Sequence, residues 1–325
     1  MEFRTTFSGP NISAKLTYES EVLSLGSCFA NMLGERLSKG KFKVLANPFG
    51  IIYNPLSLLK LLSGCLLGQP LDLKGVLNHE SRFFHYQLHS SFSADSSEVL
   101  QQQFLEQSKQ VAEQLIRCSH IFFTWGTSHV YALKDTGSVV ANCHKQPAAL
   151  FARHLLGLDE MEAAFREFQG LLLQINPNVR MVVTVSPVRH IKDGIPENQL
   201  SKSILRVFSH QLQTSYRFVD YFPSYEWMMD DLRDYRFYKN DMIHPSEVAE
   251  EYIWSQFLDS FMDPSVRSRY EKVRKLQRAM AHKPFFPEGE AHQRFLDKLR
   301  VQMEEMQPQL DFSSEIAVIQ AMKLG

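Results

Sequence analysis

Residues 21–34 read EVLSLGSCFANMLG, and this stretch decides the fold. It opens with a mostly apolar run that predicts a short buried strand. From Phe29 onward the apolar residues recur at helical spacing, which predicts an amphipathic helix. Gly26 separates the two patterns, so Ser27 and Cys28 lie where a strand turns into a helix.

The strand-to-helix junction allows two interpretations of Ser27. The first N–H groups of a helix have no partner within the helix, and the helix dipole makes this end electropositive. A nucleophilic serine at this position has oxyanion donors beside it. The simpler alternative is that Gly26 and Ser27 form a turn in which the serine only caps the helix. Other parts of the chain must distinguish the two.

Length, composition and charge narrow the class of protein. The chain has 325 residues and is 44% hydrophobic, enough for one large α/β domain or two ordinary ones. Its formal net charge of −1 gives no basis for a nucleic-acid surface built on bulk charge. It has no apolar run of about 18 residues and no secretory leader pattern, so we expect no membrane span. The four cysteines lack paired spacing, and we expect reduced thiols in a cytoplasmic protein.

Strand and helix patterns alternate along most of the chain. Such alternation, with strands that are mostly apolar throughout, predicts an α/β three-layer sandwich around a mostly parallel, flavodoxin-like sheet. The expected strands span residues 21–26, 42–45, 120–125, 180–186 and 217–219. The expected helices span residues 28–39, 55–65, 97–117, 159–174, 197–213 and 247–262. We also expect a hairpin or irregular insertion within 70–95 and a β-hairpin within 129–142.

Beyond residue 262 the composition changes. Residues 265–282 and 290–306 are highly charged and helical in pattern, and a Pro-Phe-Phe-Pro stretch separates them. We therefore expect one main domain over residues 1–262 and a C-terminal helical extension over residues 263–325. The charged helices are most simply solvated or used for self-association.

Three of the expected strands end in turns rich in small residues or proline. These turns cover residues 26–28, 126–128 and 186–190. Ligands of parallel α/β sheets bind beyond the carboxyl ends of the strands, which share one edge of the sheet. We therefore expect the three turns to lie together at one candidate site.

The sequence Asp241-Met242-Ile243-His244-Pro245 supplies a candidate base and its orienting acid. A nucleophilic serine needs a base within hydrogen-bond reach, and the base needs a carboxylate that orients it. A spacing of three places both side chains on the same side of a turn or helix start. The alternative is a capped helix start that carries a surface histidine.

The order of these motifs resembles the GSCFA-domain family, a branch of the SGNH or GDSL-like hydrolases. The family is named for the motif that stands here as Gly26-Ser27-Cys28-Phe29-Ala30. Three further stretches are similar to the family: NPFG at 47–50, SPVRH at 186–190 and DYRFY at 234–238. With the Asp241–His244 motif included, the similarity extends over roughly residues 1–260.

The resemblance implies a catalytic role for three residues. Ser27 matches the nucleophile, His244 the general base and Asp241 its orienting acid. The wider superfamily completes its oxyanion hole with a glycine and an asparagine from later blocks of the sequence. Gly50 is the candidate for that glycine.

One block departs from the superfamily pattern. The superfamily has Gly-x-Asn-Asp where this chain has Gly126-Thr127-Ser128-His129, so no asparagine amide stands there. Thr127 offers its hydroxyl or N–H instead, and Asn142 is a candidate replacement for the amide. Loss of one oxyanion donor can cost about 10²–10³ in rate, so the departure implies weaker esterase activity.

Two groups of residues that contain cysteine have alternative roles. We expect Ser27 to face the rim and Cys28 to pack in the core, since free cysteines are usually buried. A reactive or redox thiol at the helix N-terminus is the alternative for Cys28. Cys143 and His144 lack the paired short spacing typical of zinc ligands, so no metal is expected. We expect His144 or Asn142 to contact the substrate instead.

Arg189 and His190 follow the strand that ends near Ser186. They either contact a substrate carboxylate or phosphate, for which the arginine fork is suited, or form a capped loop. The aromatic residues Tyr235, Phe237 and Tyr238 either stack on a sugar ring or belong to the core.

These observations favour a serine-dependent ester hydrolase that acts on a small acyl ester through an acyl-enzyme on Ser27. The resemblance implies an O-acetylated sugar or a cell-envelope glycan precursor as substrate, and no cofactor. An O-acyltransferase of the same fold, in which a sugar hydroxyl replaces water, is one alternative. A non-catalytic ligand-binding module, favoured by the departure at Thr127, is the other. No nucleic-acid partner is expected, and the sequence sets no oligomeric state.

Overall fold

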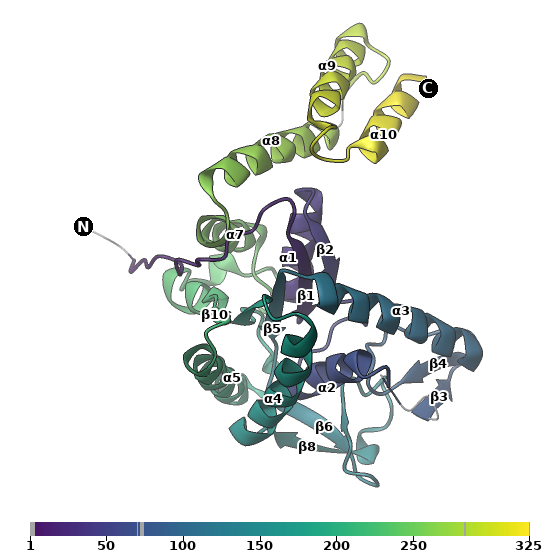
Figure 1. The fold of residues 1–325 in the computed structure, drawn as a ribbon, viewed down its shortest axis with the longest axis vertical. Helices are drawn as coiled ribbons and strands as arrows, with labels where there is room; N and C mark the ends of the chain where they lie inside the picture. Colours follow the sequence, from purple (N-terminus) through teal and green to yellow (C-terminus); the bar gives the residue numbers. More distant parts are fainter. Residues whose placement is uncertain (1–3, 70, 72–74, 283, 325) are drawn as a thin grey trace.

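Five parallel strands form the central sheet of the computed structural model, which describes residues 4–69, 71, 75–282 and 284–324. The strands lie in the order β10-β9-β5-β1-β2 (Figure 1). Their bounds are β1 Glu21–Gly26, β2 Lys43–Ala46, β5 His120–Trp125, β9 Arg180–Val185 and β10 Val219–Tyr221. All the pairings are parallel, and Leu23 lies opposite Leu45 on one side and Ile121 on the other. The predicted α/β fold is confirmed.

Helices cover both faces of the sheet. One face carries α2 Pro55–Leu66, α3 Ser97–Arg117, α4 Leu158–Ile175 and α5 Ile195–Ser215. The other face carries α1 Cys28–Lys39 and α7 Glu247–Phe261. The side chains of β1 alternate between the two cores, because Leu23 and Leu25 join the first and Val22 joins the second. The carboxyl ends of β1, β5 and β9 meet at one edge, as expected.

Two antiparallel insertions follow α2 and β5. β3 (Val76–His79) and β4 (Arg82–His85) form a hairpin within residues 70–95, of which 70 and 72–74 lie outside the described part. β6 (His129–Leu133) pairs with β7 (Val139–Val140), as expected, and also with β8 (Phe151–Leu155). The sequence did not predict β8, because its three central residues are exposed and give no apolar pattern. Short helical turns complete the main domain: η2 Ala148–Leu150, η3 Ile191–Asp193, α6 Ser224–Glu226, η4 Trp227–Asp231 and η5 Tyr235–Phe237.

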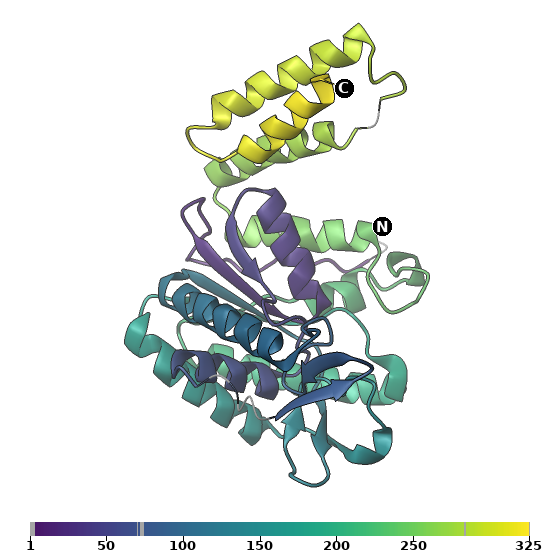
Figure 2. The same ribbon diagram turned by 90° about the vertical axis from the view of Figure 1, so that its right-hand side faces the viewer.

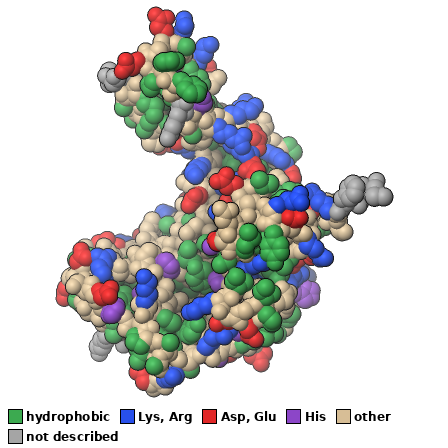
Figure 3. All heavy atoms as spheres, turned by 180° about the vertical axis from the view of Figure 1, so that it is seen from behind, with side chains coloured by type: hydrophobic (Ala, Val, Ile, Leu, Met, Phe, Trp, Pro, Cys, Tyr) green, Lys and Arg blue, Asp and Glu red, His purple; other side chains and the backbone are tan. Residues whose placement is uncertain are grey.

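Three C-terminal helices form a separate layer beyond α7, side by side in Figure 2. They are α8 Pro264–Met280, α9 Glu290–Met306 and α10 Ser313–Leu324, of which α10 was not predicted. Tyr270 of α8 packs on Gly40 and Phe42 and accepts a hydrogen bond from the Trp254 indole at 2.8 Å. Apolar side chains of α8, α9 and α10 therefore continue the core of the α1 face. In the space-filling view, basic side chains gather where these helices join the main domain (Figure 3).

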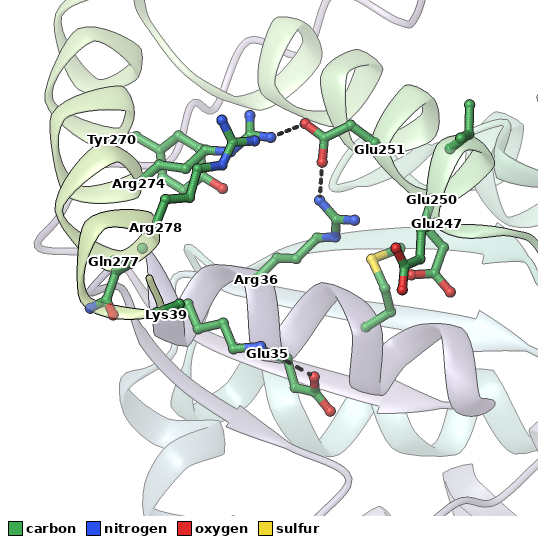
Figure 4. Close-up of a pocket in the computed structure, with 14 residues that line it drawn as sticks. Glu35, Arg36, Lys39, Glu247, Glu250, Glu251, Tyr270, Arg274, Gln277 and Arg278 are labelled. Atoms are coloured by element: carbon green, nitrogen blue, oxygen red, sulfur yellow. Dashed lines mark hydrogen bonds and ion pairs between the residues drawn. The ribbon is translucent and has the colours of Figure 1, made fainter. Parts of the chain in front are cut away.

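A charge network also connects α8 to the main domain. The Glu251 carboxylate of α7 lies between two guanidinium groups, those of Arg36 on α1 and Arg274 on α8 (Figure 4). Burial acts to raise the pKa of Glu251, but the hydrogen bonds from the two arginines outweigh burial and hold the pKa below its ordinary value. A cavity of about 850 Å³ surrounds the network, between α1, α7 and α8.

We expect Glu251→Gln to lower the free energy of unfolding by ~1 kcal/mol, because it removes the anion that two arginines share at a partly exposed site. Urea unfolding measures the change, which should shrink in 1 M salt as the charges are screened. Glu35→Gln is the matched control, since the ion pair of Glu35 with Lys39, at 3.9 Å, is fully on the surface. Equal effects of the two substitutions would contradict a role for the network.

Candidate active site

Ser27 follows β1 and caps α1, and its neighbours fix the turn. Its Oγ accepts a hydrogen bond from the Phe29 N–H at 3.3 Å, and its own N–H donates to the Thr124 carbonyl at 3.0 Å. Gly26 has a φ of +124°, and a Cβ at this position would overlap the Thr124 carbonyl. Asn47 Oδ1 accepts a hydrogen bond from the Gly26 N–H at 2.8 Å. The capping interaction considered from the sequence is thus present.

Ser27 and Cys28 differ in their exposure to solvent. Ser27 is 0% exposed, whereas Cys28 is partly exposed. The expected orientation, with Ser27 facing the rim and Cys28 in the core, is therefore wrong. The physical reason is the cap: Ser27 Oγ turns toward the N–H groups of the first helical turn, which leaves the next side chain on the accessible side.

The structure brings Asp241 and His244 into direct contact. Asp241 Oδ2 lies 2.7 Å from His244 Nδ1, and Oδ1 accepts hydrogen bonds from the N–H groups of His244 at 3.0 Å and Ile243 at 2.8 Å. These backbone hydrogen bonds, and then that of the imidazole, hold the pKa of Asp241 well below its ordinary value. With Nδ1 bound to a carboxylate, Nε2 is the ring nitrogen that can take up a proton. The side chains are 44% and 42% exposed, and Ser246 caps α7 directly after them.

Arg189 holds the Asp241–His244 loop against the end of β9. Its N–H donates to the Ile243 carbonyl at 3.2 Å, and its guanidinium donates to the Met242 carbonyl at 3.3 Å. The guanidinium also lies 4.3 Å from the ring centroid of Tyr238 and 5.3 Å from that of Tyr235. These contacts fit the capped-loop interpretation of Arg189 and give the two tyrosines a role in holding it.

His190 lies beside the rim, with its ring edge-on to Tyr53 at a centroid distance of 5.0 Å. Burial, and then the positive charges of Lys202 and His244, lower the pKa of His190 to about 3, so its ring is neutral at ordinary pH. Its Nε2 is buried and has no hydrogen-bond partner within the described part of the chain. A buried, neutral imidazole nitrogen of this kind is suited to contact a substrate.

Lys202 is a buried residue of this region that sequence reasoning missed. It lies on α5, is 1% exposed, and donates hydrogen bonds from Nζ to the carbonyls of Gly126 at 2.7 Å and Ser186 at 2.8 Å. It therefore joins the ends of β5 and β9. Burial lowers its pKa to about 7, and the charge of Cys28 opposes this shift. The sequence carried one indication of this burial: Lys202 lies on the same helical face as Leu205, which is buried.

The oxyanion donors predicted at Gly50, Gly126 and Thr127 form hydrogen bonds to other groups of the chain. The Gly50 N–H donates to a carbonyl within its own turn at 2.8 Å. The N–H groups of Gly126 and Thr127 both donate to the Tyr53 carbonyl, at 2.8 and 3.2 Å. The Thr127 hydroxyl lies 3.0 Å from Ser201 Oγ. These groups shape the rim. At the junction itself, the Phe29 N–H donates to Ser27 Oγ and the Ala30 N–H donates to the Ser27 carbonyl.

A cavity of about 480 Å³ lies between this rim and the β7-β6-β8 sheet. Four predicted residues line it together with Tyr53: Thr127, Asn142, His144 and His190. Asn142 Oδ1 accepts a hydrogen bond from the His144 N–H at 2.7 Å. His144 Nε2 lies 3.0 Å from the carbonyl of His85, the last residue of β4, and 3.0 Å from that of Leu88, so the two insertions are connected at the cavity wall.

Within the residues described, no group of three or more His, Cys, Asp and Glu side chains is arranged to hold a metal ion. No helix in the same part of the chain is long and apolar enough to cross a membrane.

The fold and the rim define an α/β protein with a candidate site where strands β1, β5 and β9 end. The chain belongs to the GSCFA family, whose sequence model matches residues 21–257. A second model, described as the C-terminal domain of GSCFA domain proteins, matches residues 273–322 and thus spans much of α8 to α10. No curated protein and no solved structure matches the chain.

We expect the stability contributed at Lys202 to depend on pH. Its pKa is about 7 in the folded chain and 10.5 ordinarily, so between these values only the unfolded chain binds the proton. Stability then rises with pH, by up to ~1.4 kcal/mol per pH unit. We expect the free energy of unfolding of wild type, measured by urea unfolding from pH 6 to 10, to rise with pH relative to that of Lys202→Met. A constant difference between the two would contradict a buried amine that loses its proton near neutrality.

Proposed function

We propose that this chain is a hydrolase or acyltransferase that acts on a small acyl ester through a covalent acyl-enzyme at the β1–α1 junction. One observation carries the proposal: a carboxylate anchored by two backbone N–H groups orients a histidine at a helix entry. This carboxylate–imidazole pair leaves His244 Nε2 as the proton acceptor. The resemblance to SGNH hydrolases agrees with this assignment of Asp241 and His244.

In the proposed reaction, His244 takes a proton from the nucleophile, which attacks the ester carbonyl. Asp241 stabilises the imidazolium ion that forms. The Cys28 N–H, the first of α1, stabilises the oxyanion, because it lies at the positive end of the helix dipole. The imidazolium then protonates the leaving alcohol, and water or a sugar hydroxyl releases the acyl group. Ser27 supplies the nucleophile, as predicted from the sequence.

The cavity beside the rim supports a small substrate. Its volume of about 480 Å³ lies within the range of small-molecule sites, and its lining mixes aromatic rings with polar groups. Tyr53 and Tyr131 offer ring faces, and Lys192 and Asn142 offer donors. Such a lining suits an O-acylated sugar, the substrate class that the family resemblance implies.

A non-catalytic binding module is the second candidate function. The observation that favours it is the engagement of the Gly50, Gly126 and Thr127 N–H groups within the rim. A module of this kind would bind the same small ligands and turn none of them over.

We expect His244→Gln and Asp241→Asn to lower kcat for acetyl-ester hydrolysis by about 10²–10⁴. The first substitution removes the base, and the second removes the carboxylate that orients it. A panel of acyl esters, with and without a sugar acceptor, measures hydrolysis and transfer together. His154→Gln is the matched control, since His154 lies exposed on β8. Full turnover by the His244 variant would rule out the mechanism, and ligand binding without turnover by wild type would favour the binding module.

A further inference from the structure

We propose that the hydroxyl group of Tyr53 donates a hydrogen bond to the oxyanion of the acyl-transfer reaction, in the place of the asparagine amide that this chain lacks. The inference rests on the proposed function and deepens it, because it adds a catalytic side chain to the groups already placed there. Tyr53 lies shortly before α2, and the sequence patterns assigned it no role.

The oxyanion needs a donor beyond the start of α1. Oxyanion holes combine preorganised backbone and side-chain donors, and the Cys28 N–H is one backbone donor. The N–H groups of Gly50, Gly126 and Thr127 all bind carbonyls of the chain. The Thr127 hydroxyl lies 3.0 Å from a second hydroxyl, that of Ser201. A further donor must therefore come from another side chain at the rim.

Backbone hydrogen bonds hold Tyr53 between the ends of β1 and β5. The Ile52 N–H donates to the Gly26 carbonyl at the end of β1, at 3.2 Å. The Tyr53 carbonyl accepts hydrogen bonds from the N–H groups of Gly126 and Thr127 after β5, at 2.8 and 3.2 Å. Tyr53 thus takes up the two backbone donors of the later block, and the same bonds hold it beside the β1–α1 junction.

Contacts of the ring orient the Tyr53 side chain and leave its hydroxyl available. A Cβ at Gly126 would lie 3.0 Å from the ring, so the glycine makes room for it. The His190 ring packs edge-on against it. Within the residues that the structure describes, no group forms a hydrogen bond with the hydroxyl. The side chain is partly exposed and lines the cavity of about 480 Å³, where a substrate can meet it.

A phenol suits this role because it donates a hydrogen bond and keeps its proton. Burial, and then the charge of Cys28, raise the pKa of Tyr53 above its ordinary value. When Ser27 attacks the ester, its proton goes to His244 and the π electrons of the C=O bond move to oxygen, where the phenol binds them. The electron pair then re-forms the C=O bond, the C–O bond to the alcohol breaks, and the imidazolium ion protonates the alkoxide.

Kinetics of Tyr53→Phe test the inference, because this substitution removes only the hydroxyl. With p-nitrophenyl acetate and the full-length chain, we expect kcat to fall by about 10² at an unchanged KM, since the oxyanion exists only beyond the ground state. Tyr216→Phe is the matched control, because Tyr216 precedes β10 and lies at the opposite edge of the sheet. An unchanged kcat in Tyr53→Phe, or a greater loss in Asn142→Ala, would overturn the inference and leave the proposed function standing.

Binding of phenylboronic acid separates an oxyanion donor from a structural role. Boronic acids add to a nucleophilic serine, and the tetrahedral adduct carries a negative oxygen as the reaction intermediate does. We expect Tyr53→Phe to weaken this binding by about 10², in parallel with kcat. Equal binding by wild type and Tyr53→Phe would overturn the inference alone. A wild-type chain that neither hydrolyses an ester nor binds the boronic acid would overturn the proposed function itself.

Discussion

The contact between Gly26 and the Thr124 carbonyl determines the geometry of the candidate site. Only a residue without a side chain fits there, at a φ of +124°, and the next N–H then donates to the same carbonyl. The contact joins β1 to β5 where α1 begins. It thereby fixes Ser27 as the helix cap and brings Cys28 to the accessible side. The direction of the helix N-terminus, and hence of its oxyanion donors, follows from the same turn.

A second constraint is the buried charge beneath this turn. Burial of a lysine costs several kcal/mol unless it is compensated, and Lys202 is compensated by the carbonyls that end β5 and β9. Burial, and then the charge of Lys202, lowers the pKa of the neighbouring His190 and keeps its ring neutral. The rim thus carries one buried, neutral imidazole, that of His190, and one exposed imidazole, that of His244.

The sequence predicted most of the fold because the signals for α1, α3 and the central strands are local caps and apolar runs. It also predicted that Asp241 and His244 would meet, since they lie three positions apart in the chain. It did not predict the relative exposure of Ser27 and Cys28, which depends on Thr124 and Asn47, remote in sequence. The sequence did not predict the role of Lys202 for the same reason, since its hydrogen-bond partner Gly126 is 76 positions away in the chain.

The central claim is that an acyl group becomes covalently bound at the β1–α1 junction during turnover. The most direct measurement is the intact mass of the chain, quenched in acid while it hydrolyses an acetyl ester. The account predicts a population that carries one acetyl group, which disappears when the ester is exhausted and is absent from the double variant of Ser27 and Cys28. A chain that turns over the ester and stays unmodified throughout would contradict it.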